Sequence, residues 1–187
     1  LYQKVRLGAS RYRRHGLEVG SRKRGYRTSA SLAVALLDEI EPENELTQIF
    51  FYHSAADRLG ATAALIGKAA ANNKPLMVYA PDADLANALD RLLWQQPATG
   101  FIPHVDAHSP LAAETPIVIA KELATLVQDE RLLNLSDDVP PGFARFAKLI
   151  EVVGLASEDR HAARQRVKFY KDRGYEIQYF DLRGKSG

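Results

Sequence analysis

The 187-residue sequence contains no cysteine, one methionine and one tryptophan, and it has no long uninterrupted hydrophobic run. The absence of cysteine excludes a disulfide framework, a cysteine nucleophile and a thiolate metal site, and it is typical of a reducing compartment. No stretch of about 18 apolar residues is present, so we expect no transmembrane helix. The first 30 residues contain no apolar segment of the kind that a secretory signal peptide requires. These absences predict a cytoplasmic protein without a membrane partner.

The sequence also lacks recognisable catalytic motifs. It has neither a G-x-G-x-x-G segment after an expected strand nor a G-x-S-x-G segment. The segment GATAALIGKA resembles a phosphate-binding loop, but the six residues between Gly60 and Gly67 are too many for that loop. It also lies within a helical pattern, and Ala69 stands where Ser or Thr would hold magnesium. We therefore expect a packed helix here and no nucleotide cofactor.

Two short clusters of titratable side chains have a simpler structural explanation. His104, Asp106 and His108 alternate in the segment HVDAH, so an extended backbone would point them to one side. A zinc site would need a fourth ligand, and none is evident, so we expect a solvated loop and no metal. Asp137 and Asp138 precede Val-Pro-Pro-Gly, which is typical of a turn rather than of paired catalytic acids. No catalytic residues are therefore predicted.

Positive charge is concentrated at the start of the chain. Residues 1–28 contain nine Lys or Arg and one acid, which gives +8, whereas residues 29–187 contain 16 basic and 22 acidic residues, which gives −6. Apart from the helix-like stretch SLAVALLDEIEPENEL, residues 1–46 show no sustained period. We expect a disordered basic extension before a folded domain at 47–187. The alternative is a basic arm that contacts DNA phosphates.

From Thr47 onwards, expected strands alternate with amphipathic helices. Near-continuous apolar strands are expected at 47–52, 74–80, 115–120, 131–136, 147–153 and 176–182. Helices are expected at 55–73, at 82–96 with Asp82 or Asp84 as N-cap, and from about 160 to a C-terminal cap at Gly174. This order predicts a three-layer α/β domain with a mostly parallel central sheet. His53, at the end of the first strand, lies near the edge where such sheets bind ligands, although a lone histidine more often satisfies a local hydrogen bond.

The segment RHAARQRVKFYKDRGY predicts an unusual helix surface. Read as a helix, one face carries a row of cations: Arg160, Arg164, Lys168 and Lys171. An apolar stripe lies beside them: Ala163, Val167 and Tyr170. The segment from 160 to 174 has six Lys or Arg and one acid, whereas solvated helices more often mix charges. Such a surface suits an acidic peptide with an apolar anchor, for example one that offers a C-terminal carboxylate. The alternative is a solvated helix face without a ligand.

Five segments of the α/β domain occur in a characteristic order: TQIFFYH, LMVYAPDADLANALDRLLW, GFIPHVDAHSPLAAETPIVI, LLNLSDDVPPGFARFAKLIEVV and ARQRVKFYKDRGY. From about Thr47 to Leu182 they resemble the chi subunit of bacterial DNA polymerase III holoenzyme. The resemblance implies a Rossmann-like fold without a working nucleotide site, and therefore no enzymatic activity and no cofactor. It also implies a clamp-loader accessory protein that pairs with the psi subunit. The same resemblance implies binding to the acidic, Phe-ending C-terminal tail of single-stranded DNA-binding protein, with only indirect contact to DNA.

The resemblance also assigns residues to the tail-binding site. The family uses an Arg and a Lys four residues apart on this helix, which correspond to Arg164 and Lys168. An aromatic residue of the F-[IV]-P-H segment also lines the family site, and it corresponds to Phe101. The position before the Lys is often aromatic in the family, whereas Val167 stands here. Tyr170 is added from its helix position alone, and the residues of the psi interface are not placed.

Arg166 is a further, weaker candidate for the tail site, suggested by its position on the helix alone. Members of the family begin at the TQIFFYH strand with an initiator methionine, and Leu46 takes that place here, so we expect residues 1–45 to come from a misplaced start. The main functional alternative is a nucleotide-binding α/β enzyme of unknown reaction. A weaker alternative is a DNA-binding module that depends on the basic N-terminal segment.

Overall fold

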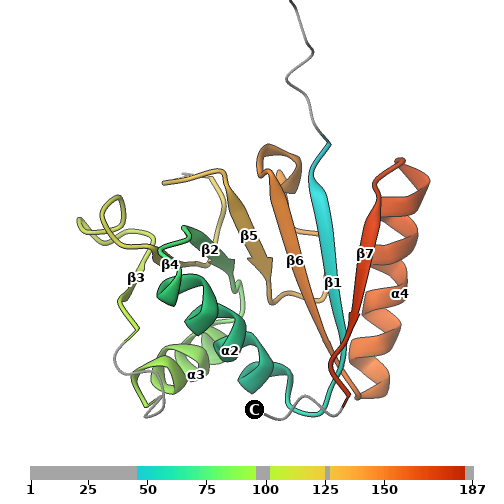
Figure 1. Cartoon of the computed structure of the whole chain (residues 1–187), viewed down its shortest axis with the longest axis horizontal. Coiled ribbons are helices and arrows are strands. Elements are labelled where there is room, and N and C mark those ends of the chain that lie inside the picture. The colour runs from blue at the N-terminus through green and yellow to red at the C-terminus, as the bar shows by residue number, and fades with distance from the viewer. Residues whose placement is uncertain (1–45, 96–101, 125–126, 184–187) are drawn as a thin grey trace, which may run out of the picture. The chain divides into compact units, whose positions relative to one another are not determined.

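The computed structural model describes residues 46–95, 102–124 and 127–183. Seven strands form its central sheet, in the order β3-β4-β2-β5-β6-β1-β7 (Figure 1). Every pair of neighbouring strands is parallel. The expected α/β architecture is therefore confirmed, with a sheet that is parallel throughout. The expected basic extension at 1–46, with its helix-like stretch, lies almost entirely outside the described residues.

The elements follow the expected alternation closely. The strands are β1 (Gln48–Ala55), β2 (Leu76–Tyr79), β3 (His104–Asp106), β4 (Ile117–Ala120), β5 (Arg131–Asn134), β6 (Lys148–Gly154) and β7 (Ile177–Asp181). The helices are α2 (Arg58–Ala71), α3 (Ala83–Trp94) and α4 (Ser157–Asp172), with one 3-10 turn, η1 (Phe143–Arg145). None of the described helices is long and apolar enough to cross a bilayer.

Helices cover the two faces of the sheet unequally. Alternate residues of the central strands face opposite ways, so Leu76 and Val78 of β2 pack under α2 and α3, whereas Met77 packs on the side of α4. In Figure 1, α2 and α3 lie in front of the sheet and α4 lies behind the edge formed by β1 and β7. Burial on both faces explains why the central strands β2 and β4 are almost continuously apolar.

Strand β3 was not expected from the sequence. The segment HVDAH, expected as a solvated loop, contributes His104–Asp106 as an edge strand paired with β4. The two histidines of this segment do not come together. His104 is buried, and its Nε2 lies 3.1 Å from Asp90 Oδ1 and its Nδ1 2.7 Å from the carbonyl oxygen of Ile102. His108 is exposed and contacts the carboxylate of Asp106. In the described part of the chain, no group of three or more His, Asp or Glu side chains could hold a metal ion.

The segment that resembles a phosphate loop is helical. Gly60 and Gly67 both lie inside α2, and Gly67 is buried. A β-carbon at Gly67 would lie 3.4 Å from the Ile102 side chain, at the edge of ordinary van der Waals contact, so α2 packs directly against the chain beside β3. The expectation of a packed helix is confirmed.

Helix α3 begins at the expected cap and offers a simple test of stability. The Asp82 carboxylate accepts hydrogen bonds from the backbone N–H groups of Asp84 and Leu85, at 2.8 and 3.0 Å. We expect Asp82→Ala to lower the free energy of unfolding by about 1 kcal/mol, because both N–H groups lose their acceptor. Urea denaturation should detect the loss, and Asp84→Ala, which removes the neighbouring charge and leaves the cap, should cost less.

Candidate peptide-binding site

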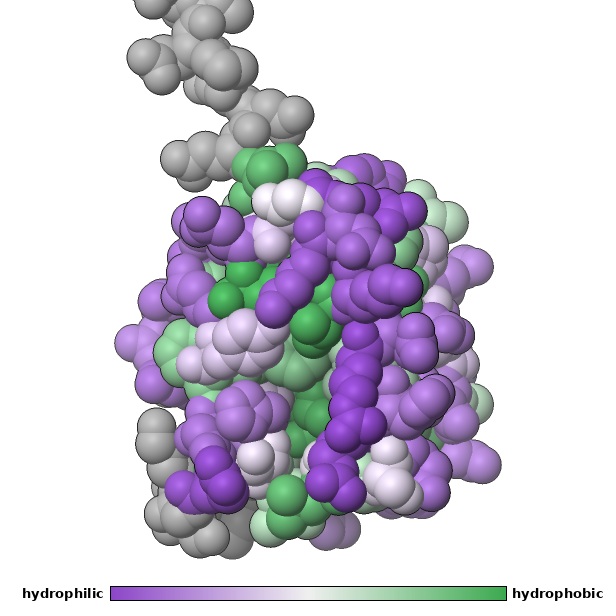
Figure 2. Space-filling model, turned by 90° about the vertical axis from the view of Figure 1, so that its right-hand side faces the viewer, coloured by the Kyte–Doolittle hydropathy of each residue, from purple (hydrophilic) through white to green (hydrophobic). Residues whose placement is uncertain are grey.

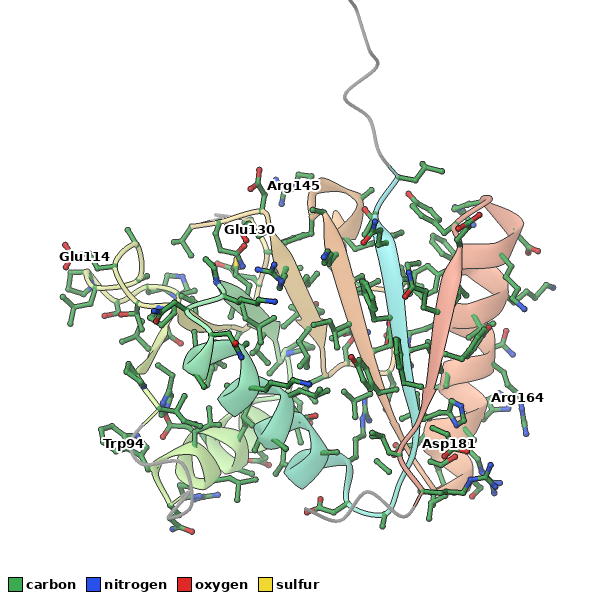
Figure 3. The ribbon with its side chains drawn as sticks, viewed as in Figure 1. Trp94, Glu114, Glu130, Arg145, Arg164 and Asp181 are labelled. Carbon is green, nitrogen blue, oxygen red and sulfur yellow. The ribbon has the colours of Figure 1, made fainter. Side chains whose placement is uncertain are left out.

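Helix α4 presents two different faces. Its inner face packs on the sheet through Ala163, Arg166 and Tyr170, which are all buried. Its outer face carries the expected row of cations, and all four are exposed: Arg160, Arg164, Lys168 and Lys171. Figure 3 shows Arg164 projecting from the outer side of the helix. The helix ends where expected, because Gly174 adopts a positive φ of 81° that favours glycine at this position.

A groove of about 550 Å³ lies between α4 and the edge of the sheet. Apolar side chains from three elements line it: Phe51 of β1, Val153 of β6, and Ala163 and Val167 of α4. Phe51, Val153 and Ala163 form a small core cluster of their own, with Val167 packed against it. Figure 2 views this edge of the molecule and shows hydrophobic surface in a hollow between hydrophilic side chains. The groove therefore combines an apolar floor with a polar rim.

The rim of the groove is strongly cationic. Four basic residues of α4 line it, with one acid: Arg160, Arg164, Lys168, Lys171 and Asp172. Within the described residues, Arg160, Arg164 and Lys168 make no ion pair and no side-chain hydrogen bond, and Lys171 lies 5.7 Å from the ring centre of Tyr179. Charges without internal partners are available to an anionic ligand. The apolar floor beside them lowers the local dielectric and strengthens such contacts.

The far wall of the groove comes from the end of β1 and from β7. Ser54 has a φ of 65°, and the pairing of β1 with β6 shifts register between Tyr52 and Ala55. This bulge lies beside His53, which lines the groove and has its Nδ1 2.9 Å from the Ser54 hydroxyl. Tyr179 of the edge strand β7 completes the wall, with its ring 5.7 Å from that of Phe51. Bulges commonly redirect a side chain near a site in this way.

A buried polar network fastens α4 to the sheet. The Glu151 carboxylate of β6 accepts hydrogen bonds from Arg166 Nε at 3.0 Å, Tyr170 Oη at 2.7 Å and Asn134 Nδ2 at 3.1 Å. Burial raises the pKa of Glu151, and the Arg166 charge and the three donors oppose that rise. Burial and the Glu151 charge also raise the pKa of Tyr170 far above its usual range, so its phenol stays protonated and donates. By holding Arg166 and Tyr170 against the sheet, the network leaves the opposite face of α4 exposed to solvent.

A second polar hub lies at the carboxyl end of the sheet. The Arg58 side chain, at the start of α2, donates to the carbonyls of Val152, Leu135 and Ser136 at 3.0–3.2 Å. It also pairs with the carboxylates of Asp137 and Asp159. Parallel α/β sheets commonly bind ligands at this edge. Here one arginine fills part of that space and joins α2 to the start of α4.

The structure brings together only part of the expected site. Arg164, Val167 and Lys168 line one groove, as the helical spacing predicts. Tyr170 does not line it: the side chain is 0% exposed and points into the core with the Glu151 network, because its hydroxyl finds a buried acceptor there. Phe101 lies outside the described residues. Its neighbour Ile102 packs with α2 and α3, beside β3 at the opposite edge of the sheet from β7.

Most of the groove wall opposite α4 was not predicted from the sequence. Phe51, Val153 and Tyr179 come from three strands that are far apart in the chain, and the basic helix does not indicate which of them it meets. One signal was available. Residues 49, 51 and 53 alternate toward one face of β1, so His53, noted for its place at the strand end, shares that face with Phe51.

Comparison with known proteins identifies the family of the chain. Residues 46–178 match the family model described as DNA polymerase III chi subunit, HolC. The DNA polymerase III subunit chi of Pseudomonas aeruginosa is 28% identical over 137 residues, which cover 71% of this chain and 95% of that protein. The subunit chi of Escherichia coli is 25% identical over 129 residues, which cover 66% of this chain and 88% of that protein. The chain therefore belongs to the DNA polymerase III chi subunit family, with a subunit role in DNA replication.

Proposed function

We propose that this chain is a non-catalytic adaptor that binds the acidic, Phe-ending C-terminal tail of single-stranded DNA-binding protein in the α4 groove. The observation that carries the proposal is a row of four cations above an apolar floor, three of which make no ion pair or side-chain hydrogen bond in the described part of the chain. Through the psi subunit, the adaptor would join that tail to the clamp loader. The psi link follows from the family alone, and co-elution of this chain with psi in size-exclusion chromatography tests it.

The groove offers a separate contact for each part of such a tail. The Arg164 guanidinium can receive the terminal carboxylate through two parallel hydrogen bonds, with Lys168, one helical turn away, as a second charge. A terminal aromatic ring suits the floor of Phe51, Val153 and Ala163. Arg160 and Lys171, at the two ends of the row, remain for the acidic residues that precede the ring. The groove volume of about 550 Å³ is adequate for one aromatic side chain and its neighbours.

The nucleotide-binding enzyme is the less favoured alternative. The glycines that would build a phosphate loop lie within α2, whose N–H groups are used by the helix itself. Arg58 also occupies part of the carboxyl edge where a nucleotide would bind. A thermal shift assay with ATP, GTP and NAD tests this alternative, because a ligand at 100 times its dissociation constant adds about 2.7 kcal/mol of stability. We expect no shift.

Removing either central cation should weaken binding of the tail. We expect Arg164→Ala and Lys168→Ala each to raise the dissociation constant of an acidic, Phe-ending peptide by about tenfold or more, because each removes a charge-assisted contact of about 1.5–3 kcal/mol. Amidation of the peptide C-terminus should weaken binding by a similar factor, since the carboxylate is the group that both cations would contact. Fluorescence anisotropy with the full chain measures all three effects.

Arg91→Ala is the matched control for these variants. Arg91 is exposed in the last turn of α3, on the opposite face of the sheet from α4, and it lines no part of the groove. Its loss removes the same net charge and should leave peptide binding unchanged. Equal binding of the free and amidated peptides, or an equal effect of Arg91→Ala and Arg164→Ala, would show that the cationic face is only a solvated helix surface.

A further inference from the structure

A second surface of the molecule also combines aromatic rings with cations. It lies on the face of the sheet opposite α4, over β6, β1 and β7. In Figure 1 this face looks toward the viewer, and α2, in front of the neighbouring strands, does not extend across β1 and β7. Most parallel sheets are covered on both faces. An uncovered parallel sheet face in the described part of the chain is therefore a candidate binding surface.

Three aromatic side chains form a stacked group on this face. Phe50 and Tyr52 project from β1 on the side away from Phe51, and Phe180 projects from the neighbouring strand β7. The ring of Phe180 stacks on Tyr52, with centres 4.8 Å apart and planes at 18°, and on Phe50, with centres 6.1 Å apart and planes at 21°. All three are only partly buried. Phe180 therefore supports two nearly parallel rings that stay accessible.

A pocket of about 360 Å³ adjoins Phe50 and Tyr52, between the sheet and the end of α2. Four cations line it: Lys68 and Lys74 near the end of α2, Arg131 of β5 and Lys148 of β6. No acidic residue is among the described side chains that line it. The Lys148 ammonium lies 5.7 Å from the ring centre of Phe50, and Arg131 is paired with Glu130 at 2.8 Å. Lys68 and Lys74 are exposed and make no ion pair within the described residues.

We propose that this aromatic and basic face binds single-stranded nucleic acid. Nearly parallel rings on a sheet surface are suited to stacking with unpaired bases, and the lysines beside them are suited to the phosphates between those bases. An acidic peptide fits this surface less well. Arginine recognises a carboxylate through a bidentate contact, and the one arginine among the described residues that line this pocket, Arg131, already pairs with Glu130. Lysines bind phosphate as point charges and need no such geometry.

The proposal goes beyond the adaptor role and does not depend on it. Chi-family resemblance implies only indirect contact with DNA, whereas this face would contact a strand directly. The α4 groove and the aromatic face lie on opposite sides of the same sheet, and Phe51 and Tyr52, adjacent in β1, line one pocket each. One molecule could therefore hold a protein tail and a nucleic-acid strand together.

Anisotropy of a labelled oligothymidylate of roughly 16 nucleotides, with the full chain, tests the proposal. We expect Lys68→Ala combined with Lys74→Ala to weaken binding about tenfold, and to reduce the slope of log K against log salt by about 1.4, or about 0.7 for each phosphate contact. Tyr52→Leu, which keeps an apolar side chain but removes the ring, should also weaken binding about tenfold. A thermal melt of each variant checks that it folds.

The matched control is Arg91→Ala combined with Lys121→Ala, two exposed cations that do not line the pocket. It removes the same charge and should change oligonucleotide binding by no more than about twofold. If the control and the Lys68/Lys74 variant lose affinity equally, or neither does, binding comes from general charge or from the basic residues 1–28, and the proposal is wrong.

A competition experiment separates the two surfaces. The acidic, Phe-ending peptide should leave oligonucleotide binding unchanged, and the Lys68/Lys74 variant should bind the peptide normally. If the peptide displaces the oligonucleotide, both share the α4 groove and the aromatic face is not the site. Failure of the peptide to bind at all would overturn the adaptor role and leave this proposal standing.

Discussion

Replacing Arg166 with alanine should lower the free energy of unfolding by about 3–5 kcal/mol. Arg166 is 2% exposed and pairs with Glu151, which is 0% exposed. The same arginine donates from Nη1 to the carbonyl of Asp137 at 2.7 Å. The variant leaves a buried carboxylate without its cation and a carbonyl without its donor. Urea denaturation of the full chain measures the loss.

Arg164→Ala is the matched control, because Arg164 lies two residues away on the exposed face of the same helix and has no partner within the described residues. It should cost less than about 0.5 kcal/mol. Adding Glu151→Gln to Arg166→Ala removes the uncompensated charge and should restore part of the stability. Equal stabilities of the Arg166→Ala and Arg164→Ala variants would mean that the buried network does not hold α4.

The loss in Arg166→Ala should depend on pH. Without Arg166, burial raises the pKa of Glu151 further above its value in the unfolded chain, since desolvation is then opposed only by hydrogen bonds. For a carboxyl group with a raised pKa, the folded state is favoured at low pH, and that stability is lost as pH rises through the folded pKa. The deficit relative to the unsubstituted chain should therefore be smaller at about pH 5 than at about pH 7.

Val167→Glu should abolish tail binding while the helix stays intact. Val167 lies on the groove side of α4, about one turn from two cations, Arg164 before it and Lys171 after it, and directly beside a third, Lys168. A carboxylate at this position would pair with those cations and repel the carboxylate of the ligand. Two like charges about 4 Å apart near a protein surface repel by roughly 4 kcal/mol. We therefore expect affinity for the acidic, Phe-ending peptide to fall by about 100-fold or more.

Val167→Gln separates charge from shape in this experiment. Glutamine has nearly the same size as glutamate and loses the same apolar contact, but it adds no charge. It should weaken binding by only about tenfold, because one buried apolar side chain contributes roughly 1.5 kcal/mol. If Val167→Glu and Val167→Gln bind the peptide equally well, the cations of α4 do not contact the ligand, and the proposed site is wrong. Helix content by circular dichroism should be the same in both variants.

Local periodicity predicted which residues of α4 share a face, but not which face is buried. Arg160, Arg164 and Lys168 line one groove, as the spacing of the sequence indicates. The same spacing placed Tyr170 beside them, and Arg166 was a weaker candidate from the same helix. Both are buried instead, because Glu151 lies on the adjacent strand β6 and accepts hydrogen bonds from both. The sequence does not distinguish a buried arginine from a solvated one, because the acceptor that permits burial lies on a different element.

The alternation of strands and helices, the parallel sheet and the cationic row of α4 could be predicted from the amino-acid sequence alone. These features depend on contacts within one turn of helix or on the continuous apolar pattern of a strand that is buried on both faces. Three features became clear from the folded structure: β3 is a strand, the opposite wall of the groove consists of Phe51, Val153 and Tyr179, and Tyr170 points inward. Each of these depends on contacts between residues that are distant in the chain, where sheet order and buried hydrogen bonds outweigh local preference.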